Sequence, residues 1–177
     1  MITWTKGSFK GRINGQLDEM RESVSTLLEY DTVNTFYRKS VSGKSSDVER
    51  YLRAQFRSAR MRNLDDIRWR SMANTDSYFD GQGAEVKTFS QLFRNLQRKQ
   101  LRKNVSSIVE SFIGQGANAD FNGRVECPIA VKLNFSGGVM EDGRFKGPYY
   151  LVGGNTRLTV AKILGIQPKI IEISLDW

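Results

Sequence analysis

The sequence has no histidine and a single cysteine among its 177 residues, and these shortages exclude several kinds of site. No disulfide can form within the chain, and a zinc site built from cysteine and histidine lacks its ligands. Catalytic pairs that join serine or cysteine to histidine are excluded too. Acid–base chemistry must therefore come from Asp, Glu, Lys, Tyr or water. Cys127 precedes Pro128 at the start of an apolar segment, and it is expected to be a small buried side chain.

Long apolar runs are also missing from the sequence. No stretch approaches the roughly 18 residues that a membrane-spanning helix needs, and the opening letters MITWTKGSFKGR lack the apolar centre of a secretory signal. We therefore expect a cytoplasmic protein with no membrane partner. Hydrophobic residues make up 39% of the chain and aromatic residues 11%. That is enough for a packed core, and the length suits one domain with an appended subdomain.

Positive charge is abundant but unevenly placed. The chain carries 27 Lys and Arg against 19 Asp and Glu, and residues 38–103 hold 16 of the basic residues but only 7 of the acidic ones. The rest of the chain is close to neutral. A basic middle third predicts an acidic partner such as nucleic acid, with DNA as our preferred partner. A solvated basic surface that aids solubility is the alternative.

Three helices are expected in or before this basic region. Apolar residues at helical spacing predict a helix over residues 16–30, another after a capping box at Ser46–Glu49, and a third that begins at Thr88. The letters SGKSS that precede the second helix are not a P-loop, because Arg38 stands where that motif needs its first glycine.

Arginines repeat at steps of three or four residues along the second and third of these helices. Such stripes suit a phosphate backbone, although an ordinary solvated face is the alternative for each. The residues assigned to nucleic-acid binding are Arg50, Arg53, Arg57, Arg60, Arg94, Arg98 and Arg102. Trp69, Tyr78 and Phe79 either stack on a base or belong to the core.

Later elements follow from the change of hydrophobic period. Residues 63–87 predict a short strand, a turn and a mobile loop around Gly81–Gly83. The remaining segments predict helices over 105–113 and 156–164 and strands over 129–135, 149–152 and 169–175. The whole pattern predicts an α+β fold with a small mixed sheet. A helical basic extension spans residues 1–87, and a compact core spans residues 88–177.

A glycine-rich turn, GGNTR, joins the expected strand 149–152 to the following helix. The first N–H groups of a helix lack partners within it and carry the positive end of its dipole, so they attract anions. Gly153 and Gly154 let the backbone approach a ligand closely, Thr156 adds a hydroxyl donor, and Arg157 can hold phosphate oxygens. Alternatively, the glycines only make a tight turn and Asn155 caps the helix.

The span that begins VECPIAVKL and ends YYLVGGNTRLTVAKILGIQPKIIEI resembles the ParB/sulfiredoxin fold. That family shares a strand with Pro-Ile, a connector, a strand followed by G-G-x-x-R, a helix with A-x-x-x-L-G, and a final strand. The resemblance covers roughly residues 100–175, with residues 104–112 at the place of the family's first core helix. It implies a nucleotide-binding site at Gly154-Asn155-Thr156-Arg157.

Known activities within the family differ in their motifs. Sulfiredoxin uses ATP to repair oxidised peroxiredoxin through Gly-Cys-His-Arg, ParB binds CTP through Gly-Glu-Arg-Arg, and free-serine kinases phosphorylate a hydroxyl through Asp-Gly-His-His-Arg. Asn155 replaces the reactive cysteine of the first and the glutamate of the second. Gly153 replaces the kinase aspartate, while Gly154 and Arg157 match in every comparison. Only Leu175–Trp177 follow the last strand, so the DNA-binding domain of ParB is not expected.

The leading hypothesis is an ATP-dependent phosphotransferase that acts on a hydroxyl in nucleic acid, such as a hydroxymethylated base in DNA. ATP or CTP with Mg²⁺ is the expected cofactor, and the metal ligands are unknown. We assign catalysis to Arg157, Glu126 and Asp142. We assign nucleotide binding to Gly153, Gly154, Asn155, Thr156, Arg157 and Lys103. The alternatives are a non-enzymatic, nucleotide-regulated DNA-binding module and a ParB-like nuclease, which needs clustered acidic metal ligands.

Overall fold

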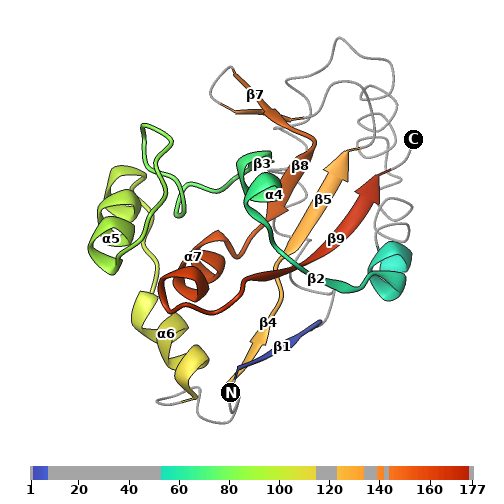
Figure 1. Ribbon diagram of the computed structural model, residues 1–177, viewed down its shortest axis with the longest axis horizontal. Helices are drawn as coiled ribbons and strands as arrows, with labels where there is room; N and C mark the ends of the chain where they lie inside the picture. Colours follow the sequence, from blue (N-terminus) through green and yellow to red (C-terminus); the bar gives the residue numbers. More distant parts are fainter. Residues whose placement is uncertain (1, 8–52, 115–122, 134–138, 142–143, 176–177) are drawn as a thin grey trace.

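The computed structural model describes residues 2–7, 53–114, 123–133, 139–141 and 144–175 (Figure 1). It has the α+β class that the sequence predicts, with a mixed five-stranded sheet at its centre. In spatial order the strands are β2 (Met61–Asn63), β9 (Lys169–Leu175), β5 (Ile129–Leu133), β8 (Tyr149–Val152) and β3 (Met72–Ala73). The predicted helix over 16–30 and the capping box at Ser46–Glu49 lie outside the described residues.

Strand β5 is the middle of the sheet and pairs on both sides. It runs antiparallel to β8 and parallel to β9, so that Ile129 faces Val152 on one side and Ile171 on the other. The outer strands β3 and β2 pair with β8 in parallel and with β9 in antiparallel orientation. Ile129, Ala130 and Val131 are all buried, because a central strand covered on both faces takes a continuous apolar run.

A second, two-stranded sheet leads into β5. Strand β4 (Arg124–Glu126) pairs in parallel with β1 (Thr3–Thr5), and the amide of Cys127 continues this ladder by donating to the carbonyl of Thr5 at 2.8 Å. Pro128 then lacks an N–H group, but its carbonyl accepts a hydrogen bond from Ile171 at 2.9 Å. The chain therefore passes from the small sheet to the large one at this proline. Cys127 is fully buried, as predicted.

Both edge strands of the five-stranded sheet come from residues before position 88. The sheet is therefore not confined to the predicted core over residues 88–177. Helix α4 (Asp66–Arg70) connects the two edge strands, and Asp65 is its N-cap: the Asp65 carboxylate accepts from the amide of Arg68 at 2.8 Å. The hairpin β6 (Val139–Glu141) and β7 (Arg144–Gly147) precedes β8.

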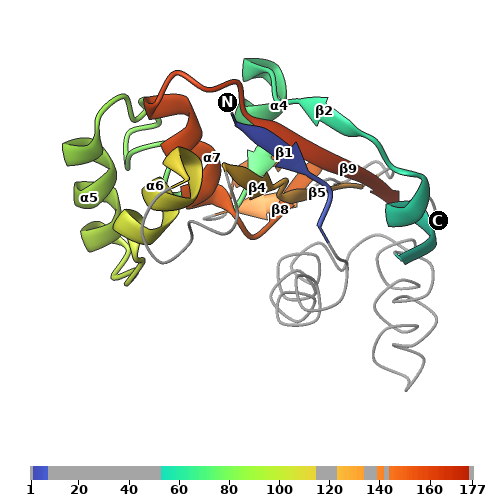
Figure 2. The same ribbon diagram turned by 90° about the horizontal axis from the view of Figure 1, so that it is seen from below.

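Helices α5 (Phe89–Arg98), α6 (Val105–Ile113) and α7 (Asn155–Ile163) gather at one side of the sheet (Figures 1 and 2). Thr88 starts α5 with a capping box to Gln91, which fixes the first turn. The helical spacing of Phe89, Leu92, Phe93 and Leu96 predicts one buried face. Leu92 and Leu96 are buried, but Phe93 is 48% exposed.

The loop predicted to be mobile around Gly81–Gly83 is a closed turn. One carboxylate oxygen of Asp80 accepts hydrogen bonds from the amides of Gln82 and Ala84, each at 2.8 Å. The amide of Asp80 donates in turn to the carbonyl of Ala84 at 2.8 Å. The bonds to its carboxylate hold the pKa of Asp80 below its usual value.

Candidate functional site

The turn before α7 requires glycine for two separate reasons. Gly153 and Gly154 have φ values of 72° and 81°, in the left-handed region that glycine enters at little cost. A Cβ atom on Gly154 would also lie 2.7 Å from Cγ and 2.9 Å from Cβ of Pro128. Close packing on Pro128 thus joins the start of α7 to the link between β4 and β5.

Gly154 is itself the N-cap residue of α7, and no side chain among the described residues caps the helix. The first intrahelical bond runs from the amide of Leu158 to the carbonyl of Gly154 at 3.0 Å. Within the part of the chain that the structure describes, the amides of Asn155, Thr156 and Arg157 therefore have no acceptor. The alternative in which Asn155 caps the helix is wrong, because Asn155 already lies inside α7.

A polar network turns the side chains of Asn155 and Thr156 toward residues 74–77. The hydroxyls of Ser77 and Thr156 are 2.9 Å apart, and both residues are buried. The amide group of Asn155 donates to the carbonyl of Asn74 at 3.2 Å, and its oxygen accepts from Ser77 at 3.3 Å. The Thr156 hydroxyl, which the sequence assigns to phosphate, is thus engaged by Ser77, and the network anchors α7 to the segment after β3.

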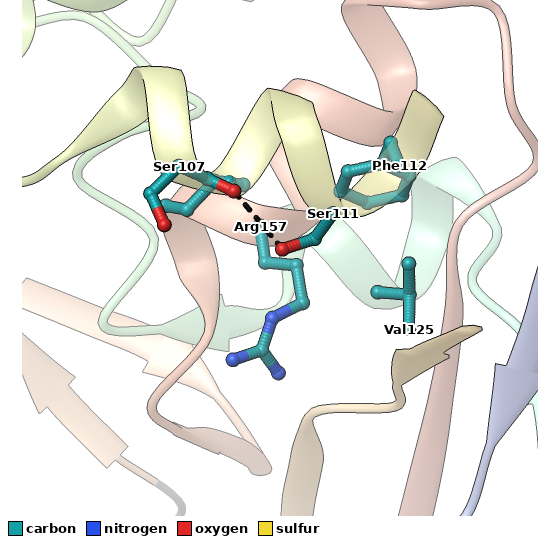
Figure 3. A pocket seen from close by; sticks show the side chains of 6 residues that line it. Ser107, Ser111, Phe112, Val125 and Arg157 are labelled. Carbon is teal, nitrogen blue, oxygen red and sulfur yellow. Dashed lines mark hydrogen bonds between the residues drawn. The ribbon is translucent and has the colours of Figure 1, made fainter. Parts of the chain in front are cut away.

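Arg157 extends from α7 between α6 and β4 (Figure 3). Its Nη1 donates to the backbone carbonyl of Glu126 at 2.9 Å. The half-buried side chain borders a pocket of about 230 Å³. The other residues that line this pocket are Ser107, Ile108, Ser111, Phe112 and Val125. Gly154 and Arg157 therefore both contact the segment 126–128.

Burial lowers the pKa of Arg157, while the nearby carboxylate of Glu126 opposes that shift. The guanidinium still keeps its charge, because the ordinary pKa of arginine is so high. It has five N–H donors. Among the residues that the structure describes, only the Glu126 carbonyl accepts from it, and no carboxylate forms an ion pair with it. A partly desolvated cation with spare donors is stabilised by a bound anion.

Of the two carboxylates assigned to catalysis, only that of Glu126 lies within the described residues. Glu126 ends β4 and is exposed, with its carbonyl rather than its carboxylate on Arg157. Asp142 lies outside the described residues. Lys103 is exposed just before α6 and does not line the Arg157 pocket. Across the described ranges, no three His, Cys, Asp or Glu side chains gather to hold a metal.

The two predicted arginine stripes are shorter than the sequence suggests. Residues 53–58 are helical, with Arg53 half-buried and Arg57 exposed, whereas Arg60 lies beyond this helix and leads into β2. Arg62 on β2 is also exposed, although it is not part of the predicted stripe. Arg50 lies outside the described residues.

The stripe on α5 ends at Arg98. Gln100 has a φ of 54°, so the helix cannot continue to Arg102. Nη1 of Arg98 would lie 3.1 Å from a Cβ at Gly81, so the guanidinium covers that glycine, and Arg94 is exposed.

The aromatic residues considered for stacking belong to the core. Trp69, Tyr78 and Phe79 are 3%, 2% and 7% exposed, and their rings meet edge to face. Burial also raises the pKa of Tyr78. The core alternative for these three residues is therefore confirmed, and they are not available to a base at the surface.

No protein family, no curated protein and no solved structure gives a significant match to this chain. None of the helices in the described ranges is long and apolar enough to cross a membrane.

Proposed function

We propose that the chain binds the phosphates of ATP or CTP at the start of α7 and transfers a phosphoryl group to a hydroxyl in nucleic acid, such as a hydroxymethylated base in DNA. The observation that carries the proposal is Arg157, a half-buried cation with spare N–H donors beside a pocket and next to an uncapped helix start. The proposal also extends the resemblance to the ParB/sulfiredoxin fold. The succession of β5, β8, α7 and β9 supports it.

The size of the pocket limits which part of a nucleotide it holds. Pockets for whole small molecules usually measure about 300–1,000 Å³, whereas the Arg157 pocket measures about 230 Å³. It therefore suits phosphate groups better than a complete nucleotide. When bound, ATP supplies the phosphoryl group, and Mg²⁺ comes with the phosphates and needs only one or two protein carboxylates.

The residues of the chain then take separate roles. Arg157 and the free amides of α7 neutralise phosphate charge and hold it in place, which is most of what phosphoryl transfer asks of a protein. Glu126 is the carboxylate whose charge acts on Arg157, and it is proposed to take the proton that the acceptor hydroxyl loses. Asp142 is the second candidate for that base.

A non-enzymatic, nucleotide-regulated DNA-binding module is the second candidate. One observation favours it: among the described residues, the six that line the Arg157 pocket include no carboxylate. Binding without turnover would follow if neither Glu126 nor Asp142 reaches the acceptor. A ParB-like nuclease remains a prediction without a supporting observation.

One labelling experiment separates the three functions. The chain is incubated with Mg²⁺, γ-labelled ATP or CTP, and either plain or hydroxymethylated DNA. Label on the hydroxymethylated DNA supports the kinase, nucleotide binding without transfer or release supports the module, and DNA nicking without added nucleotide supports the nuclease.

Arg157→Ala is the sharpest test of the anion site. Each hydrogen bond to a charged group contributes about 1.5–3 kcal/mol, so loss of two such bonds lowers nucleotide affinity by at least about 100-fold. Isothermal titration calorimetry measures the affinity, and circular dichroism checks the fold. Arg124→Ala, at an exposed arginine on β4, is the matched control and should bind normally. Unchanged binding by Arg157→Ala would remove the basis of the proposal.

A further inference from the structure

A second hollow lies between α5 and α6, apart from the Arg157 pocket. It is an open groove of about 300 Å³. Its lining residues are Phe89 and Phe93 from α5 and Val105, Ser106, Val109 and Glu110 from α6. The two helices lie side by side in both views (Figures 1 and 2). Phe93 is 48% exposed although its helix buries Leu92 and Leu96, so the groove leaves an aromatic face open to solvent.

Helix α6 separates this groove from the Arg157 pocket. On α6, the Arg157 pocket is lined by Ser107, Ile108, Ser111 and Phe112. The groove is lined by Val105, Ser106, Val109 and Glu110. Because successive residues turn by 100° around a helix, the two sets lie on opposite sides of α6. A helix with its side chains is about 10 Å across, so one ligand group cannot occupy both places.

The groove combines apolar walls with two polar groups. Two phenylalanines and two valines line it, together with the hydroxyl of Ser106 and the carboxylate of Glu110. Glu110 is half-buried, and within the described ranges its carboxylate has no hydrogen-bond or ion-pair partner. Arg102 and Lys103 are exposed, and only Asn104 separates them from Val105, the first residue of the α6 wall.

Each of these features matches one part of a nucleotide in a single strand. Aromatic side chains stack on bases, a carboxylate accepts hydrogen bonds from an exocyclic amino group, and basic residues beside the groove attract phosphate. A protein helix is a poorer occupant, because helix grooves hold anchors spread over two turns, whereas this hollow has the size of a small-molecule site.

We propose that the groove between α5 and α6 binds a nucleobase that carries an amino group, in a single strand of nucleic acid. Guanine fits best, because its N1–H and its amino group can both donate to the carboxylate of Glu110. Phe93 supplies the stacking face. The site rests on the proposed function only for its role, which is to select the sequence that is modified.

Fluorescence anisotropy tests this site without any nucleotide in the assay. Labelled oligo-dT is compared with the same strand carrying one dG, and with one carrying inosine, which lacks the amino group. The intact chain should prefer dG to inosine and inosine to dT. Stacking on one aromatic side chain changes affinity by roughly 5- to 150-fold, so Phe93→Ala should weaken binding of every strand by at least about fivefold. Ile67→Ala, at an 81% exposed apolar residue on α4, is the matched control and should change nothing.

Glu110→Gln separates base reading from stacking. It should sharply reduce the preference for dG over inosine, because the amide keeps only one acceptor oxygen, and it should not weaken dT binding, whereas a merely structural role would weaken all three affinities together. Equal affinities for the three strands, or an unchanged affinity after Phe93→Ala, would overturn the proposal. If Phe93→Ala instead alters sedimentation of the chain, the groove is a self-association surface and the proposal is wrong. None of these outcomes touches nucleotide binding by Arg157, so the two proposals fail separately.

Discussion

Replacing Gly154 with alanine should destabilise the protein strongly, and the structure sets the size of the effect. A left-handed backbone costs an alanine about 1–2 kcal/mol, and Gly154 has a φ of 81°. The added Cβ would also lie 2.7 Å from Cγ of Pro128, and overpacking of this kind costs about 1–3 kcal/mol. We therefore expect Gly154→Ala to lower the free energy of unfolding by about 2–5 kcal/mol.

Gly165→Ala is the matched control for this change. Gly165 follows α7 with a φ of 71°, and a Cβ atom added there would have no other atom within 4 Å beyond its chain neighbours. It belongs to a Schellman motif, in which the amide of Ile166 donates to the carbonyl of Ala161 at 2.8 Å. This variant should lose only the backbone part, about 1–2 kcal/mol. Urea unfolding of both variants then isolates the contact with Pro128 as the difference between them.

The contact itself is tested by a double-mutant cycle with Pro128→Gly. Removing the proline ring relieves the clash, so the double variant should be more stable than the two single losses imply, by about 1–3 kcal/mol. Thermal unfolding should show the same order, at about 2–4 °C per kcal/mol for a chain of this length. Equal losses in Gly154→Ala and Gly165→Ala, with no coupling to Pro128, would refute the packing of α7 on this proline.

Three further changes test other parts of the structure. Thr156→Val removes the bond to Ser77 and should cost about 1–3 kcal/mol in urea unfolding, but calorimetry should show unchanged nucleotide affinity because that hydroxyl is already engaged. Asp80→Asn should make the melting temperature fall less steeply below about pH 4. The pKa of Asp80 is lowered in the folded protein, so its carboxylate stabilises the fold above the unfolded-state pKa. That stability is lost as the pH falls through the folded-state pKa. Reversing Arg57 and Arg60 to Glu should weaken DNA binding and reduce the slope of log affinity against log salt by about 0.9 per lost phosphate contact; an unchanged slope would make this only a solvated surface.

Much of the second half of the fold could be predicted from local patterns. Strands β8 and β9 and helix α6 have the predicted bounds, because each is an apolar segment with a strong period between glycines, prolines or polar residues. The elements of the first half were harder to predict from the sequence. Helix α4 has five residues and the edge strands β2 and β3 have three and two, which is too short for a period, and the edge strands form only because β9 and β8 offer them backbone partners.

The candidate site shows the same division. Its glycines and Arg157 stand together in one recognisable stretch, so sequence alone singles them out. Ser77 could not be found in this way, because it meets Thr156 across 79 positions and nothing in its neighbourhood distinguishes it from any other serine. The stripe through Arg102 failed for a local reason: spacing by four predicts one face only while the helix continues, and α5 ends before that residue.

The glycines and the arginine of the turn carry different weight for the proposed function. Packing on Pro128 is enough to require a glycine at position 154, and it also explains why the helix forgoes a capping side chain, which usually contributes about 1 kcal/mol. An uncapped start is therefore a consequence of the fold as much as a sign of a ligand. Arg157 is different, because the fold does not account for all of its donors. Its hydrogen bond to the Glu126 carbonyl uses only one of its five N–H groups. Its remaining donors, held partly out of water beside a pocket, gain most from an anion, and the case for a phosphate site depends on them.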